Sequence, residues 1–235
     1  MLTRICGAAA LSLCIPLTAH AALTCNDVLK ALSKDLVDAT CFESTDLTTT
    51  NPKTTPADNS NPALPAGAWT PTTDRGVISP TGGGTPITKT VPGLQIQARI
   101  ASDPLGQARF LLRLPADWNG RLVVAGASGT RSEFNGDFAW SNYVIQKGYA
   151  YASQNKGVYN LFVSNSADPL ACRLNPDPPI FSNFFVHFYD NDPGQEFARW
   201  GEYIVKAGEI AQRGVQAGYG QPPRFTYAVG TSNGG

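Results

Sequence analysis

The sequence has few charged residues and no excess of either sign. Only 15% of its 235 residues are charged, and 18 lysines and arginines balance 18 aspartates and glutamates. A chain without a net field has no general attraction to nucleic acid or to an anionic membrane surface, so neither is expected as a partner. A neutral or apolar small molecule is the expected partner instead. The hydrophobic content of 42% is enough for a sizeable core, either as one domain or as most of one.

Long hydrophobic runs are also absent after the N-terminus. Residues 1–21 contain Arg4, an apolar stretch from Ile5 to Leu17, and the small-residue cleavage pattern Ala19-His20-Ala21. These three parts predict a signal peptide, and therefore a secreted or periplasmic protein. The alternative is an uncleaved N-terminal anchor, although the apolar stretch is too short to span a bilayer.

Cysteine is scarce once the leader is removed. Cys6 and Cys14 lie in the leader, which leaves Cys25, Cys41 and Cys172. An oxidising compartment favours a Cys25–Cys41 disulfide, which would close a short loop around the first helix. Cys172 then has no assigned partner. Either its partner lies in a part of the protein beyond this sequence, or Cys172 is a buried free thiol.

The first part of the mature chain, residues 22–93, is predicted to be a helix followed by loops. Apolar residues recur at helical spacing over Asn26–Leu36. Residues 43–93 are dense in Thr, Pro, Gly, Asn and Ser, which indicates surface loops with a short strand near Gly76–Ile78. A linker between two domains is the alternative, but the piece before it is too small to be a domain.

Residues 94–235 alternate between strand and helix patterns. The expected strands are 94–100, 108–114, 121–125, 149–153 and 225–229, and the expected helices are 140–147 and 193–218. Strand, helix and strand in succession are typical of a parallel sheet. The sequence therefore predicts an α/β fold with a mostly parallel sheet of the α/β-hydrolase type, incomplete at its C-terminus.

The last six residues, Gly230–Gly235, follow the final strand and carry a Gly-x-Ser-x-Gly pattern at Gly230, Ser232 and Gly234. In a nucleophile elbow the serine lies on a sharp strand-to-helix turn, and small flanking residues are needed because the strand and helix crowd together. Ser232 is the candidate nucleophile, and the backbone N–H of Asn233 is a candidate oxyanion donor. The alternative is an ordinary turn rich in glycine, asparagine and serine.

A second small-residue loop, Gly126–Thr130, follows the apolar strand 121–125. In α/β-hydrolases the loop at this place donates the other oxyanion N–H. A plain connection from strand to helix is the alternative.

The rest of a catalytic triad is missing from the sequence. In this type of hydrolase the acid and the histidine follow the serine, but neither residue type occurs after Ser232. The acid and base are therefore expected beyond Gly235, and these 235 residues are expected to be an inactive front half. His187 precedes the serine among Phe and Tyr and is expected to pack. Asp190 and Asp192 fit a turn and a helix cap, so no metal and no cofactor are expected.

Residues 157–192 interrupt the alternation with Pro-rich loops and a group of aromatic residues between Phe181 and Tyr189. This segment is predicted to overhang the site and shape a pocket for an apolar or aromatic group. The alternative is a hydrophobic patch that packs on the sheet.

Three motifs, in this order, resemble the tannase/feruloyl esterase family of α/β-hydrolases. They are Leu114–Arg121 with the loop Gly126–Thr130, then Lys147–Ala150, and finally Tyr219–Arg224 leading to the elbow. The resemblance implies a secreted esterase with Ser232 as nucleophile and an oxyanion hole from Asn233 and the Gly129 region.

Two positions depart from that family. Thr231 stands where the family usually has a cysteine, and Ala127 and Ser128 make the oxyanion loop less rich in glycine. The resemblance therefore implies an ester hydrolase without implying specificity for gallate or ferulate.

The expected function is hydrolysis of a small-molecule ester, aromatic or otherwise apolar, through an acyl-enzyme on Ser232. Two alternatives remain at this point. One is a peptidase or a polyester-oligomer hydrolase on the same fold, and the other is a non-catalytic binding protein that keeps the elbow as structure.

Overall fold

The computed structural model describes residues 23–51, 54, 85–104, 106–126, 133–134, 140–157, 160–162, 184–186, 198–230 and 234. The elements are, in order, α1 (Cys25–Ala31), β1 (Leu36–Ser44), β2 (Gly93–Ile100), β3 (Arg109–Pro115), β4 (Arg121–Gly126), α3 (Asn142–Ile145), β5 (Ala150–Gln154), β6 (Asn160–Phe162), β7 (Phe184–Val186), α4 (Ala198–Tyr219) and β8 (Phe225–Gly230). The predicted signal peptide and the predicted strand at 76–78 lie outside the described residues.

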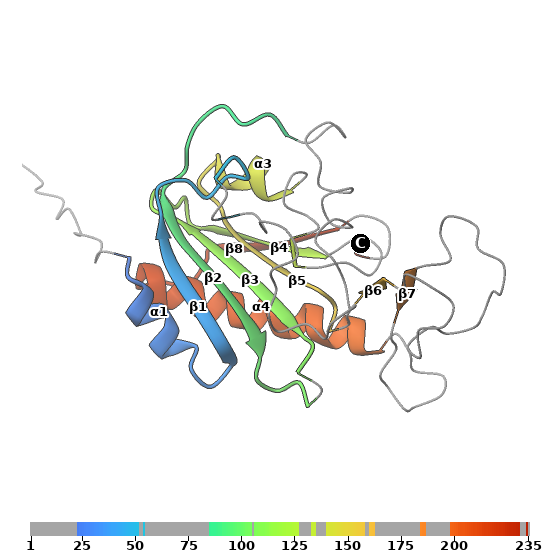
Figure 1. Cartoon of the computed structure of the whole chain (residues 1–235). Helices are drawn as coiled ribbons and strands as arrows, with labels where there is room; N and C mark the ends of the chain where they lie inside the picture. The colour runs from blue at the N-terminus through green and yellow to red at the C-terminus, as the bar shows by residue number, and fades with distance from the viewer. Residues whose placement is uncertain are drawn as a thin grey trace, which may run out of the picture.

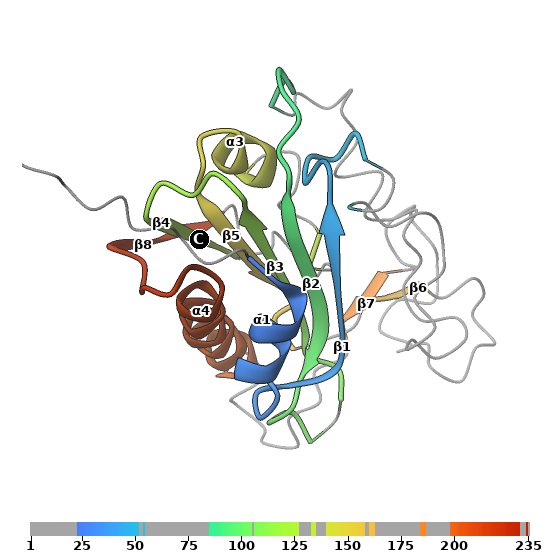
Figure 2. The same ribbon diagram turned by 90° about the vertical axis from the view of Figure 1, so that its left-hand side faces the viewer.

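The main sheet has six strands in the order β1-β2-β3-β5-β4-β8 (Figures 1 and 2). Strands β1, β2, β3 and β5 pair antiparallel, whereas β4 pairs parallel with both β5 and β8. The described residues thus form an α/β fold with a mixed sheet, and the expectation of a mostly parallel sheet is wrong for them. The antiparallel part arises because β1, β2 and β3 form a meander before the first crossover helix.

Strand β1 occupies residues that the sequence assigned to the end of a helix and to loops. Helix α1 ends at Ala31, and Leu36–Ser44 pairs with β2 from Leu36↔Ile100 to Ser44↔Gly93. The register shifts between Val37 and Thr40, and Asp38 adopts a φ of 50°. An irregular strand at a sheet edge is exposed on both faces at many positions, so the alternation that predicts a strand is lost.

Two hydrophobic clusters lie on opposite faces of the sheet. Leu112, Leu114, Leu122 and Val124 point to the face covered by α1 and α4, where α4 contributes Ala207, Ile210, Ala211 and Val215. Leu111, Val123 and Tyr151 point to the other face, where they pack with Val144 and Ile145 of α3. Figure 1 shows α1 and α4 below the sheet and α3 above it. None of the described helices is long and apolar enough to cross a membrane.

Cys25 and Cys41 form the disulfide expected from the sequence, with a Cα–Cα distance of 5.6 Å. The bridge joins the start of α1 to the middle of β1, and both cysteines pack against the core cluster. Because α1 is only seven residues long, it is too short to be stable by itself. The disulfide and the contacts with α4 therefore hold α1 on the sheet.

Strand β8 forms the last strand of the sheet opposite β1 (Figure 2). Its first four residues are exposed, and Phe225 and Tyr227 have 54% and 43% of their surface accessible. The neighbouring strand β4 is buried at every position after its first. Within the described residues, the apolar side chains of β8 are therefore largely exposed, although its backbone pairs parallel with β4.

Asp46 organises the turn that follows β1. Its carboxylate accepts hydrogen bonds from the backbone N–H groups of Thr48 and Val91, both at 3.0 Å, and from the hydroxyls of Thr48 and Thr50. Burial by itself raises the pKa of Asp46, but these four bonds to the charged form outweigh it, so the pKa lies below its ordinary value of 3.8.

We expect this carboxylate to make stability depend on acid pH. A lowered pKa in the folded state stabilises the protein above the unfolded pKa, and that contribution is lost as the pH falls through the folded pKa. Asp46→Asn should therefore lower the free energy of unfolding by about 1.5 to 3 kcal/mol at pH 7, the cost of losing bonds to a charged group. Urea unfolding of both proteins at pH 7 and pH 3 checks this. A deficit in the variant that is equally large at pH 3 would contradict the assignment.

Candidate active site at the carboxyl edge of the sheet

The carboxyl ends of the three parallel strands lie at one edge of the sheet. Strands β4, β5 and β8 end there at Gly126, Gln154 and Gly230. The connection between β2 and β3 reaches the same edge, because Phe110 at the start of antiparallel β3 pairs with Gln154. Ligands of open α/β sheets bind at such an edge, and the geometry of these four segments therefore defines the candidate site.

The chain turns sharply after β8. Gly230 is the register partner of Gly126, and four residues later Gly234 lies directly against Gly126. A Cβ placed on Gly126 would be 2.0 Å from the carbonyl oxygen of Gly234, so no side chain fits there. Gly234 itself lies in a 3₁₀ turn. Gly230 and Gly234 thus both lie against the end of β4.

Most of the residues singled out from the sequence fall outside the described residues. They are the candidate nucleophile and oxyanion donors (Ser232, Asn233 and Gly129), the free cysteine (Cys172), the histidines (His20 and His187) and the two aspartates (Asp190 and Asp192). The flanking Gly126, Gly230 and Gly234 are described. The structure therefore shows the two sides of the turn and leaves the roles of Ser232, Asn233 and Gly129 as predictions.

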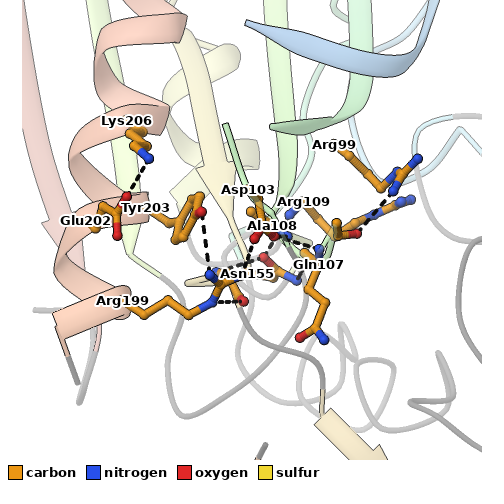
Figure 3. A network of polar contacts seen from close by, with 12 residues as sticks. Arg99, Asp103, Gln107, Ala108, Arg109, Asn155, Arg199, Glu202, Tyr203 and Lys206 are labelled. Carbon is orange, nitrogen blue, oxygen red and sulfur yellow. Dashed lines mark hydrogen bonds and ion pairs between the residues drawn. The ribbon is translucent and has the colours of Figure 1, made fainter. Parts of the chain in front are cut away.

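A buried polar network that the sequence did not predict lies beside this turn, at the ends of β5 and β2 (Figure 3). Arg199 in the first turn of α4 forms an ion pair with Asp103, with 2.7 Å between Nη2 and Oδ1. The Asp103 side chain is fully buried and that of Arg199 is 5% exposed. The other carboxylate oxygen of Asp103 accepts the backbone N–H groups of Gln107 and Ala108, both at 2.6 Å.

Asn155 connects the end of β5 to the same connection between β2 and β3. Its Oδ1 accepts the backbone N–H groups of Arg109 at 2.8 Å and Gly157 at 3.1 Å. Its Nδ2 donates to the carbonyl of Gln107 at 2.9 Å. The exit from β5 and the start of β3 are therefore fixed relative to each other by a single buried amide.

Two further buried charges lie at this edge. Glu133, on the connection that follows β4, is paired with Arg109 at 3.6 Å, and burial raises the pKa of Glu133 although Arg109 opposes the shift. Lys156 is fully buried, has a φ of 61°, and places its Nζ 4.5 Å from the centroid of the Trp200 ring. Burial lowers the pKa of Lys156 to about 8.

Buried ionisable groups with shifted pKa values gather at functional sites, and these groups gather at the sheet edge where a ligand is expected. Their signal in the sequence is weak. Asp103 begins an Asp-Pro turn, and Gln154-Asn155-Lys156-Gly157 has the composition of a surface loop. Within the described ranges, no group of three or more His, Cys, Asp or Glu side chains could hold a metal ion.

We expect Asp103→Ala to destabilise the protein strongly. The change leaves the buried guanidinium of Arg199 without its carboxylate and the N–H groups of Gln107 and Ala108 without an acceptor. Breaking a buried ion pair in this way costs about 3 to 5 kcal/mol. Chemical unfolding measures the loss, and Asp103→Asn is the matched control because it keeps an acceptor for the two N–H groups. Equal stability of the alanine variant and the wild type would contradict the expectation.

Comparison with known proteins gives remote structural likenesses only. No model of a protein family matches the sequence, and no curated protein matches it. Feruloyl esterase B from Aspergillus oryzae is similar in structure at a TM-score of 0.40 and 18% identity, over 85% of this chain and 30% of that one. An esterase from Aspergillus oryzae is similar at a TM-score of 0.44 and 12% identity, over 89% of this chain and 33% of that one.

The chain thus spans about a third of the length of these two solved structures. Likenesses this remote assign no activity to it, and the candidate function rests on the residues at the carboxyl edge.

Proposed function

We propose that the chain carries the nucleophile of a carboxylic ester hydrolase. In this proposal Ser232 Oγ attacks the ester carbonyl carbon, the alcohol leaves with a proton, and water then releases the acid from the acyl-enzyme. The acyl-enzyme divides one difficult displacement into two easier steps.

The contact of Gly234 with Gly126 is the observation that carries the proposal. A nucleophile elbow requires a sharp turn within a few residues of the strand end, and small residues wherever the backbones touch. Strand β8 pairs parallel with β4, and the chain returns to β4 within four residues of Gly230. Glycines occupy all three described positions at this contact, Gly126, Gly230 and Gly234, and this supports the proposed elbow.

The same pairing supports the proposed oxyanion hole. Gly126 and Gly230 are register partners, so the segments that follow them begin one strand spacing apart, about 4.8 Å. The N–H of Asn233 and an N–H of the Gly129 region are the proposed donors to the developing oxyanion. The proposal leaves the acid and base of the triad to residues beyond Gly235.

Export and the substrate class belong to the proposal as well. The Cys25–Cys41 disulfide supports an oxidising compartment, as the N-terminal leader pattern predicts. The substrate is proposed to be a small aromatic or otherwise apolar ester, because charged residues are few and aromatic residues are dense between Phe181 and Tyr189.

Labelling with a fluorophosphonate tests the proposal. The protein expressed from its complete gene is incubated with the probe, and the modified peptide is identified by mass spectrometry. A covalent adduct on Ser232, blocked by prior denaturation, is the expected result. An unlabelled Ser232 in the folded protein would refute the esterase and favour a binding protein that keeps the turn as structure.

A further inference from the structure

Arg199 joins the start of α4 to the residues that follow β5. The exit from β5 ends at Gly157, and α4 begins at Ala198. Nε of Arg199 donates to the carbonyl of Gly157 at 2.6 Å. This hydrogen bond therefore joins two residues that are 42 positions apart in the chain.

Other contacts fix the guanidinium in place. Nη2 pairs with Asp103 at 2.7 Å, and the guanidinium carbon lies 4.5 Å from the centroid of the Tyr203 ring, one turn along α4. Figure 3 shows Arg199 between Tyr203 on the helix and the segment around Asp103 and Asn155. The planar guanidinium of arginine can bind a carboxylate and a carbonyl at once in a fixed geometry. The ammonium of a lysine at this position would be a single charge on a flexible side chain and would not fix both partners.

The backbone conformation and the close packing at position 157 require a glycine. It has a φ of 71°, and a Cβ placed on it would be 2.4 Å from the ring of Tyr203. Asn155 accepts its N–H, and Arg199 binds its carbonyl. The N–H of Gly157 is therefore held by Asn155 within the same segment, and its carbonyl is held by Arg199 from α4, at the edge where the substrate is proposed to bind.

We propose that Arg199 is a positioning residue for substrate binding, acting by holding Asn155–Gly157 at the carboxyl edge. The inference rests on the proposed esterase function. Strand β5 is two strand spacings from β8, about 10 Å, so Arg199 does not reach the reacting bond. Its effect passes through the segment that it holds, which lies at the same carboxyl edge of the sheet as the end of β4. The consequence is a change in substrate affinity with little change in the chemical step.

Arg199→Lys tests this inference, because it keeps a cation beside Asp103 and removes the second arm of the fork. We expect the KM to rise about tenfold with kcat within about twofold, because the displaced segment contacts the substrate less well while the reacting groups stay in place. Hydrogen exchange measured by mass spectrometry should be faster in the peptide that contains Asn155–Gly157. The melting temperature should fall by about 2 to 4 °C for each kcal/mol lost, because the bond to Gly157 also stabilises the fold.

Arg213→Lys is the matched control. Arg213 also pairs with an aspartate, Asp35, at 2.8 Å, but it lies near the other end of α4 and is half-exposed. The same substitution there should leave both KM and the exchange of Asn155–Gly157 at wild-type values. If Arg199→Lys does not fold, the double variant Asp103→Asn with Arg199→Gln removes both buried charges together and is measured in the same way.

The outcomes separate this inference from the proposed function. If the wild-type protein is not labelled at Ser232, the proposed esterase function is refuted, and the role of Arg199 in substrate binding is refuted together with it. A labelled and active wild type together with an unchanged KM in Arg199→Lys overturns this inference alone. A parallel loss of kcat, substrate affinity and melting temperature also overturns it, because that pattern indicates general damage to the fold.

Discussion

Replacing Ser232 by alanine is expected to abolish covalent labelling by a fluorophosphonate and to lower kcat by a factor of about 10⁶. The loss is this large because the proposed mechanism uses the Ser232 hydroxyl as its nucleophile, and the sequence offers only the hydroxyl of Thr231 beside it between Gly230 and Gly234. The hydroxyl oxygen forms the acyl bond, so no neighbouring group can replace it without a new nucleophile geometry. Ester hydrolysis by the protein from the complete gene measures kcat, and the melting temperature shows whether the fold is kept.

Ser33→Ala is the control for this experiment. Ser33 is exposed after α1 and donates to the carbonyl of Lys30 at 2.9 Å, far along the chain from the sheet edge. Labelling and hydrolysis should be unchanged in that variant. If Ser232→Ala hydrolyses the ester at the wild-type rate, the nucleophile has been assigned to the wrong residue.

Gly126→Ala is expected to reduce kcat/KM by about 100-fold or more while the sheet remains folded. The added methyl group would lie 2.0 Å from the carbonyl oxygen of Gly234, so the turn has to move away from β4 by more than an ångström. A displacement of about 1 Å at a reacting group costs about 100-fold in rate. Steady-state hydrolysis and the rate of fluorophosphonate labelling measure the effect.

Gly201→Ala serves as the comparison for this glycine. It lies within α4, and a Cβ placed on it meets nothing within 4 Å. Alanine is favoured over glycine inside a helix by about 0.5 to 1 kcal/mol, so this variant should be as active as the wild type and slightly more stable. Full activity in Gly126→Ala would mean that Gly234 does not need its place against β4, and the elbow interpretation would fail.

The strands with strong hydrophobic patterns were predictable from the sequence. The alternation over residues 94–100 and the apolar run at 121–125 correspond to β2 and β4, and the predicted order of strand, helix and strand is confirmed by β4, α3 and β5. Strand β1 was not predictable, because its burial follows a bulge and an edge position rather than a period of two. The two strands 94–100 and 108–114 were predicted as a hairpin, and the antiparallel pairing of β2 with β3 confirms it, whereas the antiparallel pairings of β1 with β2 and of β3 with β5 were not predicted.

The candidate site was predictable only where a short local motif carries it. The glycines around Ser232 are local in sequence, and the structure places Gly126, Gly230 and Gly234 together. The pair formed by Asp103 and Arg199 joins residues far apart in the chain, and neither has a local pattern that indicates burial. Partners of this kind become visible only when the fold brings the end of β2 and the start of α4 to one edge.

The hydrogen bond between Arg199 and Gly157 also bears on how such a protein diversifies. Because Gly157 and Arg199 are joined directly by this bond, the length of the chain between them has little effect on the geometry of the sheet. Doubling the length of a closed loop costs only about 0.6 kcal/mol in closure entropy. Insertions, deletions and grafts between Gly157 and Ala198 are therefore tolerated at little thermodynamic cost. Under the proposed esterase function, changes of length between these two residues are a route by which substrate preference could be engineered while the main sheet is left unchanged.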